Sequence, residues 1–227
     1  MGRTILVGDV HACRDELDAL LAKVAFGEGD QLVAVGDLVV RGPDPRGTLD
    51  LLRAVSARAV RGNHEDRLLR HRSAPRDNPV SEQTLATARA LRKRDWALLE
   101  ALPLWIDLPE HGVRVIHAGL VPGVPIEQQD PHTLMYVRSL DRHGAPVEKR
   151  GRFLWGERYG GPEHVVFGHN ARPDPQIHAF ATGLDTGCVY GGNLTAMVLA
   201  DGALPPPPRD RASVLVSIKA RRRYTDK

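Results

Sequence analysis

Three short apolar runs in the first third of the chain each lead into glycine and a polar side chain. The runs are residues 5–7, 32–35 and 57–60, and they lead into Gly8-Asp9, Gly36-Asp37 and Gly62-Asn63-His64. Between the first two runs, Leu17, Leu20, Leu21 and Val24 have helical spacing, and residues 45–53 also favour a helix. The order predicts an α/β fold, with polar residues at the sheet edge where ligands bind in such folds.

The second half of the chain is predicted to be rich in strands. Strands are expected over residues 113–116, 165–167, 194–199 and 214–218. A turn-rich break at 72–80 precedes one helix, which is expected to start at Ser81, run past Trp96 and end before Pro103. With 227 residues in total, the sequence predicts a single domain, 1–227, that carries a helical insertion near 67–102.

Composition excludes several classes of protein. No apolar run reaches 18 residues, which argues against a membrane-spanning helix, and the first apolar run is too short for a signal peptide. The two cysteines, Cys13 and Cys188, lack ligand spacing to a second soft donor, so ordinary buried side chains in a cytoplasmic protein are expected. A net charge of +3 and 5% aromatic residues give a nucleic-acid-binding module little support.

Metal-ligand residue types follow five of the expected strands. They are Asp9 and His11, then Asp37, then Asn63 and His64, then His117, then His169. Carboxylate and amide oxygens mixed with imidazole suit a first-row divalent ion such as Mn, Fe, Co or Zn. These candidates are too many for one closed tetrahedral site and fit two ions that share a carboxylate. The neighbouring glycines are expected to let the backbone turn tightly.

Ordered sequence blocks carry a resemblance to a known family. They are Gly8-Asp9-Val10-His11, Gly36-Asp37-Leu38-Val39-Val40-Arg41-Gly42, Gly62-Asn63-His64-Glu65, His117-Ala118-Gly119 and Gly168-His169. The chain resembles the calcineurin-like metallophosphoesterases of the phosphoprotein-phosphatase superfamily, and within them the bacterial symmetrical diadenosine tetraphosphate hydrolases. The resemblance implies a β-sandwich flanked by helices, with the metal site at the C-terminal ends of the strands.

The resemblance also implies a role for each site residue. Asp9, His11 and Asp37 would hold one ion, and Asp37, Asn63, His117 and His169 the other, with manganese the first expectation. Arg41 would clamp a phosphate and His64 would act in catalysis without binding metal. Asn63 and Arg158 are the further expected substrate contacts, Arg158 because the family has an arginine between the last two histidines. These roles suit the residue types, since guanidinium forks phosphoryl oxygens and imidazole can protonate a leaving oxygen.

One departure from the pattern shifts the expected substrate. Val40 stands where protein phosphatases carry an aspartate that orients the catalytic histidine, so Asp66 becomes the candidate support for His64. The expected reaction is symmetrical hydrolysis of diadenosine tetraphosphate to two ADP by a metal-bound hydroxide. The alternatives are a protein phosphatase or broad phosphoesterase, and an RNA 5′ dinucleotide-cap hydrolase. A catalytically dead regulator would need a broken ligand position, and none is found. No membrane and no stable protein partner are implied.

Two groups of arginines and Asp185 have further expected roles. The arginines between residues 67 and 94 fit either a basic rim that grips polyphosphate or the solvated face of a helical insertion. Arg221, Arg222 and Arg223 are expected to form a solubilising tail, and Asp185 to shape a turn before the last strands.

Overall fold

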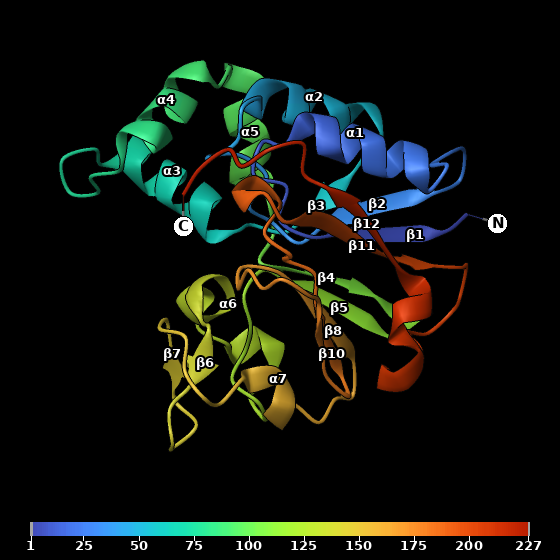
Figure 1. Cartoon of the computed structure of the whole chain (residues 1–227). Helices are drawn as coiled ribbons and strands as arrows, with labels where there is room; N and C mark the ends of the chain where they lie inside the picture. Colours follow the sequence, from blue (N-terminus) through green and yellow to red (C-terminus); the bar gives the residue numbers. More distant parts are fainter. Residues whose placement is uncertain (1, 227) are drawn as a thin grey trace.

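The computed structural model describes residues 2–226 and contains two five-stranded sheets stacked face to face (Figure 1). In order across the first sheet, the strands are β12 (Leu215–Lys219), β11 (Asn193–Leu199), β1 (Thr4–Val7), β2 (Gln31–Ala34) and β3 (Arg58–Ala59). The second contains β4 (Trp105–Leu108), β5 (Val113–Ile116), β8 (His164–Phe167), β10 (Ala181–Gly183) and β9 (Gln176–Ile177). A separate hairpin pairs β6 (Ser139–Leu140) with β7 (Pro146–Val147).

The helices form layers outside the two sheets. On the first sheet lie α1 (Arg14–Lys23), α2 (Pro45–Ala54), α3 (Asn63–Ser73), α4 (Glu82–Ala90) and α5 (Lys93–Ala101), all in the upper part of Figure 1. On the second lie α6 (Pro131–Tyr136) and α7 (Trp155–Arg158). Short 3₁₀ helices are η1 (Pro109–His111), η2 (Ile126–Gln128), η3 (Cys188–Tyr190) and η4 (Pro208–Val214).

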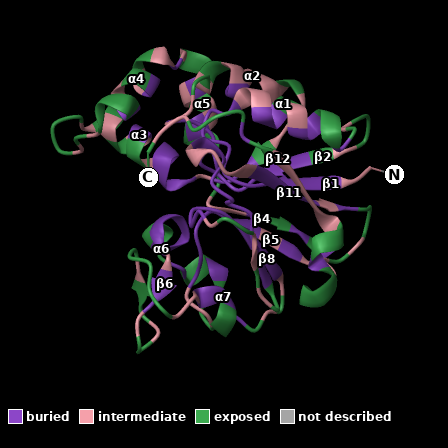
Figure 2. Cartoon of the chain, viewed as in Figure 1, coloured by how far each residue is buried: buried purple, intermediate pink, exposed green. Residues whose placement is uncertain are grey.

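Alternating side chains on the strands fill the spaces between these layers. In β1, Ile5 and Val7 pack toward the helices, whereas Leu6 packs between the sheets. Val33, Val115 and other buried residues complete the layer between the sheets, drawn in purple in Figure 2. The expected α/β architecture, a β-sandwich flanked by helices, is confirmed.

Strand direction brings the functional loops to one edge. Strands β1, β2 and β3 are mutually parallel, and so are β5, β8 and β10 in the other sheet. Within each set, the carboxyl ends therefore open at the same edge, where ligands bind in α/β sheets.

The expected single helix from Ser81 past Trp96 is wrong, because the chain is extended at Leu91 and Arg92 between α4 and α5. The Asp95 carboxylate accepts hydrogen bonds from the backbone and side chain of Arg92 and so starts a new helix. The start was predicted correctly, since the Ser81 hydroxyl caps α4 through the backbone N–H of Thr84. Within residues 2–226, no helix is long and apolar enough to span a lipid bilayer.

Candidate metal and phosphate site

Side chains from both sheets converge at the carboxyl ends of the strands. Asp9 and His11 follow β1, Asp37 follows β2, Asn63 and His64 begin α3 after β3, His117 follows β5, and His169 follows β8. All seven are buried, none more than 7% exposed. The sheet edge thus brings together residues that lie up to 160 positions apart in the sequence.

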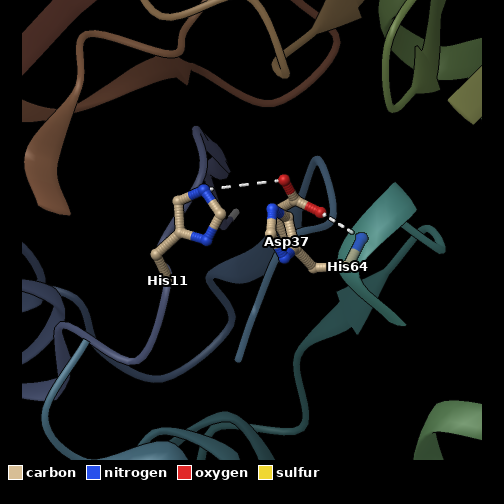
Figure 3. Close-up of side chains that lie close together, drawn as sticks. All are labelled: His11, Asp37 and His64. Atoms are coloured by element: carbon tan, nitrogen blue, oxygen red, sulfur yellow. Dashed lines mark hydrogen bonds and ion pairs between the residues drawn. The ribbon is translucent and has the colours of Figure 1, made fainter. Parts of the chain in front are cut away.

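Asp37 lies at the centre of two overlapping groups of donor atoms. In one group, donor atoms of His11, Asp37 and His64 all lie within 4.8 Å of one another, and in the other the same holds for Asp37, His117 and His169. Its Oδ2 is 3.5 Å from His11 Nε2, and its Oδ1 is 3.4 Å from His117 Nε2. Figure 3 shows Asp37 between His11 and His64, with its Oδ1 accepting the backbone N–H of His64. Each carboxylate oxygen therefore faces a different imidazole, as a bridging ligand requires.

Backbone carbonyls set the orientation of two of the histidines. Nδ1 of His117 donates to the carbonyl of Val35, at 2.8 Å, and Nε2 of His169 donates to the carbonyl of Tyr136, at 3.1 Å. In the neutral rings the other nitrogens are then acceptors, and both face Oδ1 of Asn63, at 3.1 and 2.9 Å. Acceptors turned toward one another with no proton between them leave a place for a cation.

The electrostatics of the cluster also fit cations. Burial, with the charges of Asp185 and Asp37, raises the pKa of Asp9 well above its usual value. Burial lowers the pKa of His11 to about 4, and its buried Nδ1 has no hydrogen-bond partner within residues 2–226. Burial opposes ionisation of Asp37, but the neighbouring histidines outweigh it and hold the pKa of that carboxyl low. Imidazoles beside buried carboxylates match the donor set of first-row divalent ions.

Asp9 stands apart from both groups of donors. Its two carboxylate oxygens accept the backbone N–H of His169, at 3.1 and 3.0 Å. Its side chain therefore holds the β8 loop, whereas His64, expected to bind no metal, has a ring nitrogen among the donors around His11 and Asp37. The expected set of Asp9, His11 and Asp37 is thus not gathered in the structure.

Two glycines beside the cluster allow a carboxylate side chain to pack directly against the backbone. A Cβ on Gly168 would lie 1.8 Å from Oδ1 of Asp9, and one on Gly62 would lie 2.3 Å from Oδ1 of Asp37. Neither glycine has a positive φ, so the turning role expected of them is wrong at these two positions. Each glycine instead leaves room for a carboxylate against the backbone.

Backbone strain is concentrated in the same loops. Eight non-glycine residues among those described have positive φ, and six of them belong to the site's loops: His11, Ala12, Asp37, Val40, Arg41 and His169. Val40, at φ 74°, is the most unusual, because β-branched residues rarely adopt this conformation. Such strain costs about 1–3 kcal/mol per residue and is typical of functional sites.

Three arginines share a pocket of about 230 Å³ with the donor atoms. They are Arg41, Arg138 and Arg150, joined in the lining by Asp185 and Tyr190. Arg41 hydrogen-bonds the Tyr190 hydroxyl, and Arg150 donates to Oδ1 of Asn170. Burial and the charge of Arg150 lower the pKa of Arg138, whose buried Nε has no partner within residues 2–226. These crowded cations point to an anionic ligand.

Arg158 is not part of this pocket. It lies exposed on α7 with its guanidinium stacked on Phe153, 4.6 Å from the ring centre. Arg138 and Arg150 also lie between His117 and His169 in the sequence, and they occupy the position expected of Arg158. No motif marks any of the three arginines, so the sequence offered no way to choose among them.

Replacing Arg138 by alanine is expected to raise KM for a phosphorylated substrate about tenfold to a hundredfold, because a hydrogen bond to a charged group contributes about 1.5–3 kcal/mol. Arg158→Ala, on the exposed face of α7, is the matched control and should leave kinetics unchanged. Steady-state kinetics on both variants measures this. Equal effects of the two substitutions would contradict the assignment.

The structure does not bring Asp66 to His64. The Asp66 carboxylate accepts a hydrogen bond from the Tyr136 hydroxyl, at 2.7 Å, and pairs with Arg70 at 2.6 Å. It makes no hydrogen bond to His64 within residues 2–226. Asp66 therefore ties α3 to α6, and the support predicted for His64 is wrong in its geometry.

Glu65 is a functional residue that the sequence reasoning missed. Its buried carboxylate accepts four backbone N–H groups, from Asp37, Leu38, Val39 and Gly62. Burial and the charge of Asp37 raise the pKa of Glu65 to about 7, despite these donors. The available signal was its place three residues after Gly62 at a helix start, where a glutamate reaches back to the backbone. Glu65 holds the Asp37 loop in position.

The two cysteines are buried, as expected, and the fold brings them together although neither has ligand spacing in the sequence. Donor atoms of Cys13, Cys188 and Glu16 lie within 4.8 Å of one another, inside the core. Glu16 also accepts the backbone N–H of Arg221 and the hydroxyl of Tyr224. The C-terminal tail is thus anchored to the core, beyond the solubilising role expected of it.

Asp185 forms the expected turn and also lines the arginine pocket. Its Oδ1 accepts the backbone N–H of Gly187, which forms that turn, and its side chain also lines the arginine pocket. Burial raises the pKa of Asp185 to about 6, in part because Asp37 lies nearby.

Known proteins share this arrangement. Residues 2–202 match the family described as calcineurin-like phosphoesterases. The asymmetrical bis(5′-nucleosyl)-tetraphosphatase PrpE of Oceanobacillus iheyensis is 30% identical over 84% of this chain and 86% of its own length. The symmetrical bis(5′-nucleosyl)-tetraphosphatase of Shewanella oneidensis is 40% identical over 60% of this chain and 52% of its own length. A crystal structure provisionally identified as a diadenosine tetraphosphatase superposes with a TM-score of 0.83, at 36% identity over 96% of this chain and 94% of that one. The chain belongs to the calcineurin-like phosphoesterase family.

Proposed function

We propose that this protein hydrolyses dinucleoside tetraphosphates and cleaves diadenosine tetraphosphate between its two central phosphates to give two ADP. The observation that carries the proposal is the pocket in which two buried donor groups share Asp37 and face Arg41, Arg138 and Arg150. A chain of several phosphates matches a row of guanidinium groups beside cation ligands better than a single phosphate does.

The donor atoms fit two cations, and the family depends on two metal ions. In our proposal His11 and Asp37 would hold one ion, manganese first, and Asp37, Asn63, His117 and His169 would hold the other. Two such ions, when bound, polarise the phosphoryl oxygens and lower the pKa of water. The protein's own part is to hold these donors in fixed orientations through Glu65 and the carbonyls of Val35 and Tyr136.

Arginine and histidine side chains complete the reaction. Arg41 and Arg138 pair with the oxygens of neighbouring phosphates and orient the chain for in-line displacement. His64 lines the pocket and donates a proton to the oxygen of the departing nucleotide. Its pKa lies well below the usual range because the ring is buried, and a bound polyphosphate would favour the protonated ring.

Val40 favours a dinucleotide over a phosphoprotein. In protein phosphatases an aspartate at this position orients the catalytic histidine and favours its charged form. Val40 has no carboxylate and cannot do this for His64. No other carboxylate hydrogen-bonds the His64 ring within residues 2–226. We expect that the good leaving group of a phosphoanhydride needs less help from His64 than the alkoxide of a phosphoserine does.

The three arginines of the pocket favour cleavage between the two central phosphates, and analysis of the products tests this directly. Attack at an inner phosphate leaves charged phosphates on both sides of the reacting one, which three guanidinium groups can pair with. The related proteins include enzymes named as asymmetrical and as symmetrical tetraphosphatases, so the reaction products are needed to identify the position of cleavage. Chromatography of diadenosine tetraphosphate incubated with enzyme and Mn²⁺ should show ADP alone. ATP with AMP would reject central cleavage, and no turnover would reject the function.

A further inference from the structure

A second, larger cavity opens beside the arginine pocket. It has a volume of about 570 Å³ and shares the lining residues Arg41 and His64 with that pocket, so the two lie side by side. Its walls are α3, residues 78–81, the start of α4, and residues 225–226 near the C terminus. Figure 1 shows the C terminus beside α3, which places the tail along this side of the molecule. We call this cavity the insertion pocket.

The arginines of residues 67–94 divide into those that line the insertion pocket and those that lie away from it. Arg72, Arg89, Arg92 and Arg94 are paired with carboxylates away from the cavity. Arg67 and Arg70 line the cavity. Of the two readings left open by the sequence, the solvated face therefore fits the first four arginines and the polyphosphate rim fits the last two.

Among the described arginines that line the cavity, Arg67 is the one available to receive a ligand. Arg70 is held by the Asp66 carboxylate and the Tyr136 hydroxyl. Arg67 stacks on the Tyr136 ring, 5.4 Å from its centre, and makes no ion pair or hydrogen bond within residues 2–226. A guanidinium placed over an aromatic ring keeps its N–H groups available for phosphate oxygens.

The rest of the lining suits a nucleoside. Val40, Pro79 and Val80 offer apolar surface, and Ser81, Gln83 and Thr84 offer polar groups. The amide nitrogen of Gln83 donates to the carbonyl of Arg41, which leaves its oxygen as an acceptor. A volume of this size falls in the range of small-molecule sites, about 300–1,000 Å³, and holds one nucleoside with its nearest phosphate.

We propose that the insertion pocket binds the nucleoside of the departing nucleotide and that Arg67 pairs with a phosphate of that nucleotide. The departing half is assigned here because His64, which lines both cavities, lies next to the leaving oxygen. This inference rests on the proposed function, since it concerns how the same site holds its substrate. It makes Arg67 a specificity-determining residue that separates nucleotides from simple phosphoesters.

The test compares two substrates on the full-length protein loaded with Mn²⁺. The variant Arg67→Ala should raise KM for diadenosine tetraphosphate and Ki for ADP about tenfold or more, the scale of one lost charge-assisted hydrogen bond. Its kcat/KM for p-nitrophenyl phosphate, which has no nucleoside, should stay within about twofold of wild type. Arg89→Ala is the matched control, because Arg89 lies in the same insertion and, within residues 2–226, pairs only with Glu82.

A second variant keeps the inference falsifiable if Arg67 acts by charge alone. Val80→Trp fills the insertion pocket without touching the donor atoms and should raise the same two constants, with thermal unfolding confirming that it folds. Unchanged KM and Ki in both variants would overturn the proposal, and so would equal losses on both substrates. If wild type hydrolyses the phosphoester but not the dinucleotide, the proposed function fails, and ADP inhibition still tests the pocket.

Discussion

Asp37→Asn is expected to reduce kcat/KM by about a thousandfold or more and to lower the content of bound metal. Asp37 is the one residue shared by both donor groups, with one oxygen toward His11 and the other toward His117. An amide offers one oxygen where two are needed and removes the negative charge that holds two cations close together. Metal-assisted stabilisation is worth several kcal/mol of the barrier, and each 1.36 kcal/mol is a factor of ten.

Measuring the metal content of each variant together with its kinetics separates a loss of metal binding from a loss of catalysis alone. His64→Ala is the comparison, because we place His64 at the leaving oxygen and not among the ligands. It should cut turnover strongly and retain about two ions per chain, whereas Asp37→Asn should lose both turnover and metal. If His64→Ala loses an ion, its ring is a ligand, as its distance from His11 and Asp37 would also allow. Wild-type activity in Asp37→Asn would reject the shared site.

The part of this site that the sequence predicted follows from strand direction. Parallel strands place their carboxyl ends at one edge, so residues that follow the apolar runs must lie near one another. Asp37, Asn63, His117 and His169 needed no further information, because each lies within three residues of the end of a strand or at the first turn of a helix. Residues 5–7 and 32–35 are apolar throughout, so the sequence did not predict which of their side chains fill the space between the sheets.

The rest depends on long-range packing that local patterns do not encode. Arg138 and Arg158 have equivalent positions in the sequence, but α6 ends beside the pocket and α7 points its arginine at solvent. Cys13 and Cys188 are 175 residues apart and meet only because β11 pairs with β1. Asp66 is close to His64 in sequence, yet α3 turns its side chain toward α6. The packing of helices and strands, and not residue type, decides each of these placements.

Glu65→Ala is expected to destabilise the protein by about 3–5 kcal/mol, the largest effect on stability we predict. The carboxylate satisfies four backbone N–H groups, three of them in the Asp37 loop and one at Gly62. Removing it leaves buried donors unsatisfied, each worth about 1–3 kcal/mol, although water entering the space offsets part of that loss. For a chain of this length the melting temperature should fall by about 10 °C.

The same substitution should also reduce turnover, because the loop that it releases carries Asp37 and strained Val40 and Arg41. Strained backbone persists only where its surroundings hold it, so loss of these hydrogen bonds lets the loop relax away from the donor geometry. Glu100→Ala is the matched control, an exposed glutamate on α5 whose removal should change stability by less than about 0.5 kcal/mol. Glu65→Gln keeps the shape and some of the acceptors and should fall between the two in thermal unfolding. A Glu65→Ala protein as stable and active as the Glu100→Ala control would show that the loop holds its conformation without this carboxylate.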